Sequence, residues 1–306
     1  MVAKISLVKH EFRALGTQVE FLYPPQDGAQ KRVARAERWL HAFEQRLSRF
    51  QTLSELSRLN RSSGRPFRAS PLLFSQVALA IDLARRSGGL FDPTILGQLE
   101  GAGYDRSFEL ISDAMRAAAG ERQADWRAVG LDRATRTVLL PEGLGIDLGG
   151  VAKGWAVDRL AAILGCPALT NAGGDIYAAG APPGGPAWLV SIEDPLSPER
   201  DVLVLGVKDR GVATSSTVRR RWKIGERWAH HLIDPRTGRP SESDVIAATV
   251  IASKAYLADY HAKVALLLGR REGLDYLNRE REIEGLLVER DGGILKSRSL
   301  SRYLTP

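Results

Sequence analysis

The sequence predicts an α+β fold, and two observations lead to that class. Helical and strand-like patterns both occur along the 306 residues, without the regular alternation of strand and helix that builds a parallel α/β sheet. The hydrophobic share of 44% and the charged share of 26% are those of an ordinary globular protein with a sizeable core. We therefore expect mixed sheets with packed helices in a single compact unit.

Four helices are predicted from apolar periodicity and from residues that begin or end a helix. The first covers residues 29–50, where apolar residues recur three and four positions apart. The second begins after Ser70 as N-cap, with Pro71 at the first helical position. The third covers residues 153–164 and the fourth residues 255–268, and a glycine follows each of them.

Short strand-like runs lie between these helices. They cover residues 19–23, 188–192, 202–207, 245–251 and 286–289. The Gly/Pro-rich stretch 180–186 is too short for a linker between domains and is interpreted as a connection. The expected organisation is an N-terminal segment over residues 1–11, followed by one domain over residues 12–306.

The formal net charge of +7 favours an anionic partner, although solubility is an equally simple explanation. The basic residues are scattered, with one dense run at residues 219–221, and no recognition helix, zinc finger or aromatic platform accompanies them. Nucleic acid is therefore not an expected partner. The single cysteine, Cys166, excludes an intramolecular disulfide framework and a cysteine-built metal cluster.

The start of the chain carries no recognisable targeting signal. Residues 1–12 contain several charges and no apolar stretch of signal-peptide type, and no uncharged apolar run elsewhere has membrane-spanning length. We expect a cytoplasmic protein without membrane insertion.

Three glycine-containing or histidine-containing segments are candidates for chemistry. Residues 145–154 precede the third helix, where glycine permits close approach of a ligand and free N–H groups suit phosphate. The spacing is neither a Walker loop nor a dinucleotide fingerprint, and a plain tight turn is an equal alternative. Residues 171–176 are typical of a turn between two strands. The third segment includes residues 212–215 and 231–240, where a lone histidine is more often structural than catalytic.

Taken in this order, the three segments resemble the FAD:protein FMN transferase family (the ApbE family). Further landmarks are Leu-Gly-Thr at 15–17, a segment beginning Ser-Arg-Phe at 48–60, Gly-Leu-Phe-Asp-Pro-Thr at 89–94, and Gly-Tyr-Asp-Arg-Ser-Phe at 103–108. Each landmark is modest, but their joint order is specific. The resemblance extends from residue 12 to about residue 277.

The resemblance implies a T-fold-related α+β architecture that holds FAD in a cleft. The implied FAD contacts are Leu15, Phe67, Leu90, Phe91, Asp92, Asp147, Lys153 and Ile233. Apolar side chains of this kind can sandwich an isoalloxazine or adenine ring, and carboxylates can accept hydrogen bonds from adenine, flavin or ribose. Core packing is the alternative role for Leu90, Phe91 and Ile233.

The implied reaction moves FMN from FAD to a client protein. A Thr or Ser hydroxyl of the client attacks the FMN-side phosphorus of FAD and AMP leaves, which requires a base and charge neutralisation. His231 occupies the position of the family's proposed base, and a register error of one residue would select His230 instead. An FAD pyrophosphatase and an FAD-binding protein without turnover are the alternatives.

One position departs from the family. There, an Asp and a Thr four residues later on one helix hold magnesium together with a backbone carbonyl, here that of Gly150. This chain keeps Asp259 but has Lys263 at the Thr position, and a protonated lysine has no lone pair for a metal. We therefore include Lys263 with His231 as a candidate catalytic residue. In this interpretation the ammonium of Lys263 itself neutralises the pyrophosphate. The alternatives are conventional magnesium use, a binding-only site, or a surface Asp–Lys pair that contributes about 0.2–0.5 kcal/mol.

Overall fold

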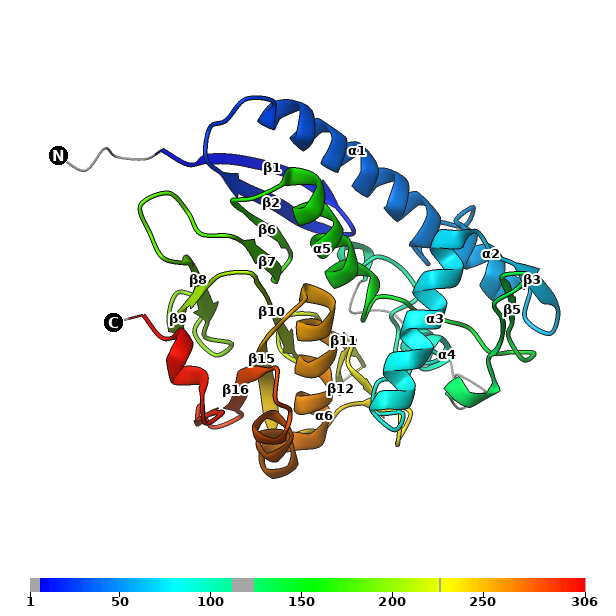
Figure 1. The fold of residues 1–306 in the computed structure, drawn as a ribbon. Helices are drawn as coiled ribbons and strands as arrows, with labels where there is room; N and C mark the ends of the chain where they lie inside the picture. Colours follow the sequence, from blue (N-terminus) through cyan, green and yellow to red (C-terminus); the bar gives the residue numbers. More distant parts are fainter. Residues whose placement is uncertain (1–5, 112–123, 226, 306) are drawn as a thin grey trace. The chain divides into compact units, whose positions relative to one another are not determined.

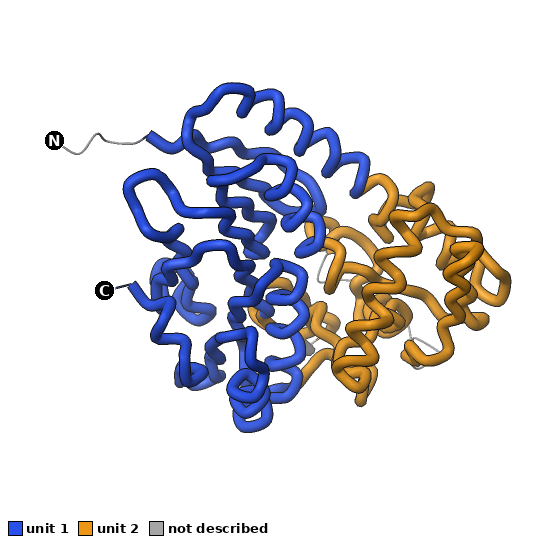
Figure 2. The backbone as a smooth tube through the Cα atoms, in the orientation of Figure 1, with its two compact units in different colours: residues 1–43, 153–215, 243–306 blue, residues 44–152, 216–242 orange. Residues whose placement is uncertain are grey.

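The computed structural model describes residues 6–111, 124–225 and 227–305, and their contacts group into two compact units (Figures 1 and 2). Unit 1 comprises Met1–Phe43, Lys153–Ser215 and Ser243–Pro306, and unit 2 comprises Glu44–Ala152 and Ser216–Glu242. Both units contain helices and antiparallel strand pairs, so the α+β class is confirmed. The organisation into residues 1–11 and 12–306 stays a prediction, and the first strand begins at Val8.

Unit 1 is built on an eight-stranded sheet with the order β1-β2-β6-β7-β10-β15-β16-β17 (Figure 1). Its strands are Val8–Ala14, Thr17–Tyr23, Ala168–Ala172, Asp175–Ala179, Arg210–Ser216, Val245–Ala252, Glu284–Glu289 and Ile294–Lys296. Every residue of β15 is buried, which explains its nearly continuous apolar sequence, interrupted by Thr249. A separate hairpin pairs β8 (Trp188–Glu193) with β9 (Asp201–Val207). All five predicted strands are therefore present.

Three helices have most of their residues in unit 1: α1 (Ala29–Leu47), α5 (Ala152–Leu164) and α6 (Ala255–Arg279). The rings of Trp39 and Phe43 on α1 lie 6.1 and 5.7 Å from that of Trp155 on α5, which fixes the two helices against each other. Helix α6 packs on β15 and β16.

The predicted end of α6 at residue 268 is wrong, because the helix is interrupted there but does not end. Gly269 has a φ of 79° and interrupts the helix, but helical structure resumes and continues to Arg279. The backbone N–H of Arg270 donates to Asp244 (2.9 Å), so the second segment has its own cap.

The segment 171–176 is a turn between two strands, as predicted. Gly173 and Gly174 connect β6 to β7 with φ angles of 60° and 94°, a conformation that favours glycine. A Cβ at Gly173 would also collide with Thr17 at the start of β2. The turn places Asp175 at the first position of β7.

The described residues of unit 2 form three α-helices, a small sheet and two hairpins. The helices are α2 (Glu55–Arg61), α3 (Pro71–Arg86) and α4 (Leu96–Gly101); the strands are β3 (Pro66–Arg68), β4 (Gly130–Asp132), β5 (Thr137–Leu139), β11 (Arg221–Ile224), β12 (Arg227–His230), β13 (Ile233–Asp234) and β14 (Arg239–Pro240). The predicted cap of α3 is confirmed, because the Ser70 hydroxyl accepts from the backbone N–H of Leu73 (3.3 Å).

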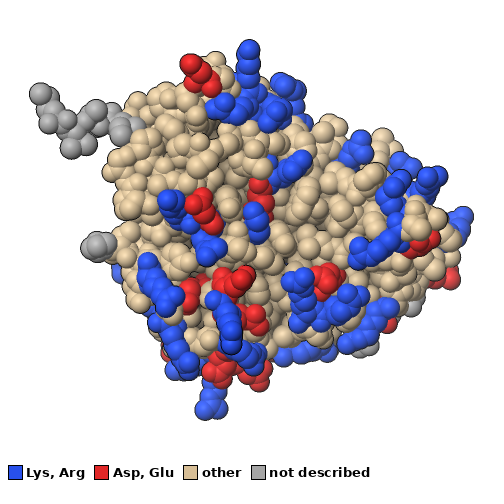
Figure 3. Space-filling view, viewed as in Figure 1, with Lys and Arg blue, Asp and Glu red and all other residues tan. Residues whose placement is uncertain are grey.

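Charges of both signs share the molecular surface. On the face drawn in Figure 3, Lys and Arg side chains are interspersed with Asp and Glu side chains. Within the described part of the chain, no helix combines the length and apolar character needed to cross a bilayer.

Candidate functional site

The loop before α5 is organised by a buried ion pair. Arg49 Nε lies 2.7 Å from Asp147 Oδ2, and both side chains are largely buried. The other oxygen of Asp147 accepts from the backbone N–H of Gly149 (2.8 Å). The Arg49 guanidinium also donates to the Tyr104 carbonyl (2.7 Å) and lies over the rings of Phe50 and Tyr104. These contacts fix the position of Asp147 in unit 2. Sequence analysis did not select Arg49 as a site residue, although Arg49 lies inside one of the sequence landmarks.

Asp92 is held by donors from its own surroundings. Oδ1 accepts from the backbone N–H and hydroxyl of Thr94 (2.8 and 2.6 Å), and Oδ2 accepts from the backbone N–H of Trp126 (3.4 Å). Burial raises the pKa of Asp92, and the hydrogen bonds from Thr94 oppose that shift. Phe91 is buried and Leu90 half-buried beside it. Phe67 lies half-buried on β3. These contacts support a structural role for Asp92, and an additional contact with FAD stays a prediction.

The two adjacent histidines have different environments. The His230 ring donates from Nε2 to the Ser241 carbonyl (3.0 Å) and accepts at Nδ1 from the backbone N–H of Leu232 (3.3 Å). Because a carbonyl only accepts and an amide N–H only donates, both contacts require one neutral tautomer. His230 is therefore a structural residue. His231 is half-buried as a residue, and its ring packs edge-to-face against Tyr104 with centroids 6.4 Å apart.

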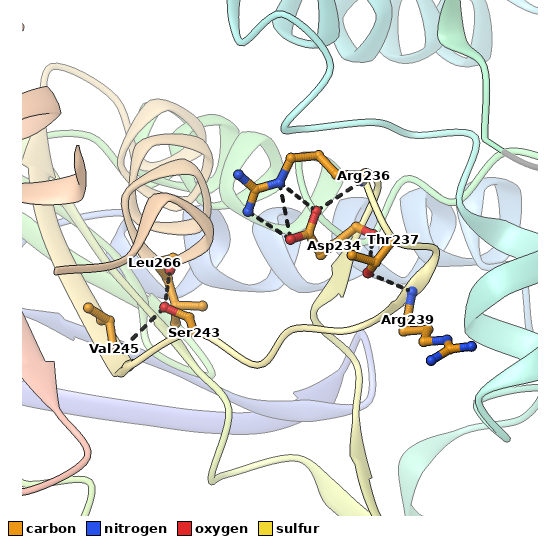
Figure 4. A network of polar contacts seen from close by, with 7 residues as sticks. All are labelled: Asp234, Arg236, Thr237, Arg239, Ser243, Val245 and Leu266. Carbon is orange, nitrogen blue, oxygen red and sulfur yellow. Dashed lines mark hydrogen bonds and ion pairs between the residues drawn. The ribbon is translucent and has the colours of Figure 1, made fainter. Parts of the chain in front are cut away.

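The turn that follows His231 is fixed by Asp234 (Figure 4). The carboxylate accepts from the backbone N–H of Arg236 (2.9 Å) and from two nitrogens of its guanidinium (3.0 and 2.7 Å). The Asp234 carbonyl accepts from the backbone N–H of Gly238 (2.8 Å). Ile233, just before this turn, is buried in a cluster with Tyr104, so core packing is its observed environment.

In unit 1, Figure 4 shows how β15 is joined to α6. The Ser243 hydroxyl donates to the Leu266 carbonyl (2.7 Å) and accepts from the backbone N–H of Val245 (3.1 Å). This contact holds the C-terminal part of the first α6 segment against the start of the strand.

Leu15 adopts a backbone conformation that is unfavourable for leucine. It forms the two-residue turn between β1 and β2 with Gly16, and its φ of 55° lies in the left-handed region. That conformation costs about 1–2 kcal/mol for a residue with a Cβ. Strain of this kind clusters at functional sites, and the Leu15 side chain is half-buried.

Four charged side chains meet where α5, β7 and α6 come together. Lys153 Nζ forms an ion pair with Asp175 and donates to the Ala172 carbonyl (3.4 Å). Lys263 Nζ lies 2.9 Å from Asp259 Oδ1. Burial raises the pKa of Asp175, and the charge of Lys153 opposes that shift. The structure thus brings together three predicted site residues and one that sequence analysis missed, Asp175, whose only signal was its position after the glycine turn.

The donor set around Asp259 does not fit a magnesium ion. Asp259 Oδ2 is buried and accepts no hydrogen bond from the described residues, which taken alone would suit a cation. Its other oxygen, however, already accepts from the Lys263 ammonium, a positive charge at the position where magnesium needs an oxygen ligand. Over the described residues, no three His, Cys, Asp or Glu side chains form a metal-binding group. The contribution expected of the Gly150 carbonyl stays a prediction.

Comparison with known proteins places these residues in a family. The ApbE family model matches residues 15–287. An FAD:protein FMN transferase of Treponema pallidum is 31% identical over 255 residues, covering 77% of this chain and 70% of that protein. A protein of the same name from Salmonella typhimurium is 30% identical over 257 residues, covering 80% and 71%.

Solved structures share the fold. The ApbE protein of Thermotoga maritima has a TM-score of 0.89 at 23% identity, covering 98% of this chain and 100% of that one. Flavin transferase ApbE from Vibrio cholerae has a TM-score of 0.82 at 25% identity, covering 98% and 99%. With the match over residues 15–287, these findings show that the chain belongs to the ApbE family.

Proposed function

We infer that this protein is an FAD:protein FMN transferase, which moves the FMN half of FAD to a client protein. The observation that carries this inference is the family match over residues 15–287, supported by relatives that are named for this reaction. The acceptor is a Thr or Ser hydroxyl. Its oxygen bonds to the FMN-side phosphorus, the bond from that phosphorus to the bridging oxygen breaks, and AMP leaves.

His231 takes the proton from the attacking hydroxyl. The structural assignment of His230 supports this choice, because both ring nitrogens of His230 are engaged with the backbone. His231 is half-buried as a residue, which leaves part of it accessible to a reactant, and its ring Nδ1 is buried. A base positioned in this way contributes about 10²–10⁴-fold to the rate.

The residues proposed to recognise FAD are those at the positions that the family resemblance implies: Leu15, Phe67, Leu90, Phe91, Asp92, Asp147, Lys153 and Ile233. The buried ion pair of Arg49 supports a recognition role for Asp147, because a fixed carboxylate loses little freedom when it binds a ligand. The first-turn position of Lys153 on α5 supports contact with phosphate, since the helix N-terminus favours anions. Magnesium has no part in this proposal, because the residues around Asp259 do not fit it.

The test is incubation of the purified protein with FAD and a protein extract from cells that lack the gene. A fluorescent flavin band that survives denaturing electrophoresis, with AMP released in equal amount, is the expected result. Release of both FMN and AMP without a band would instead identify a pyrophosphatase. Bound FAD with no AMP would identify a binding protein, and either result contradicts transfer.

The cytoplasmic location, and the absence of nucleic acid as a partner, remain predictions. Fractionation of cells that express the protein, followed by immunodetection, tests the location. Recovery with a fraction other than the cytoplasm would contradict it.

A further inference from the structure

The four side chains Lys153, Asp175, Asp259 and Lys263, all in unit 1, form a compact charge cluster. Asp175 and Asp259 are exposed by only 2% and 5%. Asp175 is close enough to Asp259 and Lys263 to interact electrostatically with both of them, in addition to its ion pair with Lys153. Two cations thus accompany two buried anions, and the cluster is neutral without a metal ion.

The neutrality matters because a buried carboxylate must be paired. Removing one partner of a buried ion pair leaves a charge that the protein interior does not solvate. In this chain Lys263 is the cation that pairs Asp259, at 2.9 Å. A divalent ion added at the same place would meet the ammonium and raise the local charge well above neutrality.

Lys263 can interact with an anion while it stays paired. An ammonium has three N–H donors, and the contact with Asp259 uses one of them. The side chain is 18% exposed, so it is not sealed inside unit 1. Lysine is a common point-charge ligand for phosphate. Lys153 supplies a second positive charge in the same cluster, and it lies in the first turn of α5.

We propose that Lys263 replaces a divalent metal ion as the positive charge facing the diphosphate of FAD, so that this protein binds FAD without a metal. This inference rests on the proposed function, because the diphosphate is that of the FMN donor. Asp259 positions Lys263, which neutralises the diphosphate directly.

The first experiment uses the unmodified protein. FAD affinity is measured by calorimetry in EDTA and again with excess magnesium, and we expect the two dissociation constants to agree within about twofold. Manganese binding is measured separately by electron paramagnetic resonance, and we expect no site that saturates together with FAD. Loss of FAD affinity by about tenfold or more in EDTA would overturn the inference.

The second experiment compares Lys263→Thr with a matched control. Lys263→Thr restores the hydroxyl that the family has at this position, so FAD binding should become at least about tenfold weaker in EDTA than in magnesium. Arg271→Thr removes one positive charge from the exposed surface of the same helix and should leave FAD binding independent of metal. Equal affinity of Lys263→Thr in EDTA and in magnesium would contradict the assignment.

The outcomes separate this inference from the proposed function. Failure to bind FAD under every condition would refute the proposed function itself. FAD binding that requires magnesium in the unmodified protein would refute only the role of Lys263. If circular dichroism shows that Lys263→Thr does not fold, the measurements on the unmodified protein still decide the question.

Discussion

At the residue scale, the adjacent histidines provide the sharpest test of mechanism. His231→Ala should abolish FMN transfer and leave FAD affinity within about tenfold, or 1.4 kcal/mol, because a base acts on the attacking hydroxyl rather than on bound FAD. Transfer is measured as AMP release and as flavin-labelled protein, and affinity by calorimetry.

His230→Ala is the matched control for that variant. It removes two hydrogen bonds to the backbone and should lower the free energy of unfolding by about 1 kcal/mol for each, with transfer retained. An inactive His230→Ala protein beside an active His231→Ala protein would reverse the assignment.

Leu15 offers a second test at the residue scale. Leu15→Asn should raise the free energy of unfolding by about 1 kcal/mol, because asparagine tolerates the left-handed conformation at the β1–β2 turn better than leucine. The same variant should weaken FAD binding, since the apolar side chain is lost. Urea denaturation and calorimetry measure the two effects. A more stable variant with unchanged FAD affinity would show that Leu15 does not contact FAD.

At the scale of elements, Asp158 joins two helices. It lies on α5, and its carboxylate accepts from the backbone N–H groups of Ala255 and Tyr256 in the first turn of α6 (2.9 and 3.2 Å). Asp158→Ala leaves these groups without their acceptor and should lower the free energy of unfolding by about 1–2 kcal/mol. Thermal and urea denaturation measure the loss, and a variant as stable as the parent would contradict this capping role.

The same carboxylate predicts a dependence on pH. Burial raises the pKa of Asp158 from 3.8 to about 6, against the opposing hydrogen bonds from Ala255 and Tyr256. Between these two values the folded state binds the proton more strongly than the unfolded state does, so the contribution of Asp158 to stability falls as pH rises through that window. Urea midpoints from pH 4 to 7 should therefore fall more steeply in the parent than in Asp158→Ala. Parallel slopes would contradict the raised pKa.

At the scale of the whole molecule, recognition of FAD should depend on its diphosphate. Both Lys153 and Lys263 belong to the charge cluster of unit 1, and riboflavin has no phosphate for either lysine to neutralise. Riboflavin should therefore bind more weakly than FAD by about tenfold or more. Calorimetry with both ligands measures the difference, with added salt as the control because salt screens charge. Equal affinities would show that the isoalloxazine ring alone is recognised.

Short-range patterns in the sequence account for much of the secondary structure, and its ordered landmarks identify the family. Apolar periodicity and end signals located α1, α3, α5 and the first part of α6, because these depend on neighbours within one or two turns. The order of the landmarks identified the family, and Lys263 could be recognised as a departure because its position is fixed by Asp259 four residues earlier. β1 and β10 were not predicted, since strands depend on partners distant in the sequence.

The environments of the candidate residues follow from tertiary packing and not from local sequence. The pairing of Arg49 with Asp147, and the arrival of Asp175 beside Lys153, join segments that are far apart in the chain. The distinction between His230 and His231 likewise depends on Ser241, which returns to His230 through the turn fixed by Asp234. Local sequence specifies which residues are present and the elements they form. The burial and charge of their neighbours, which set what each side chain can do, exist only once the distant segments have packed.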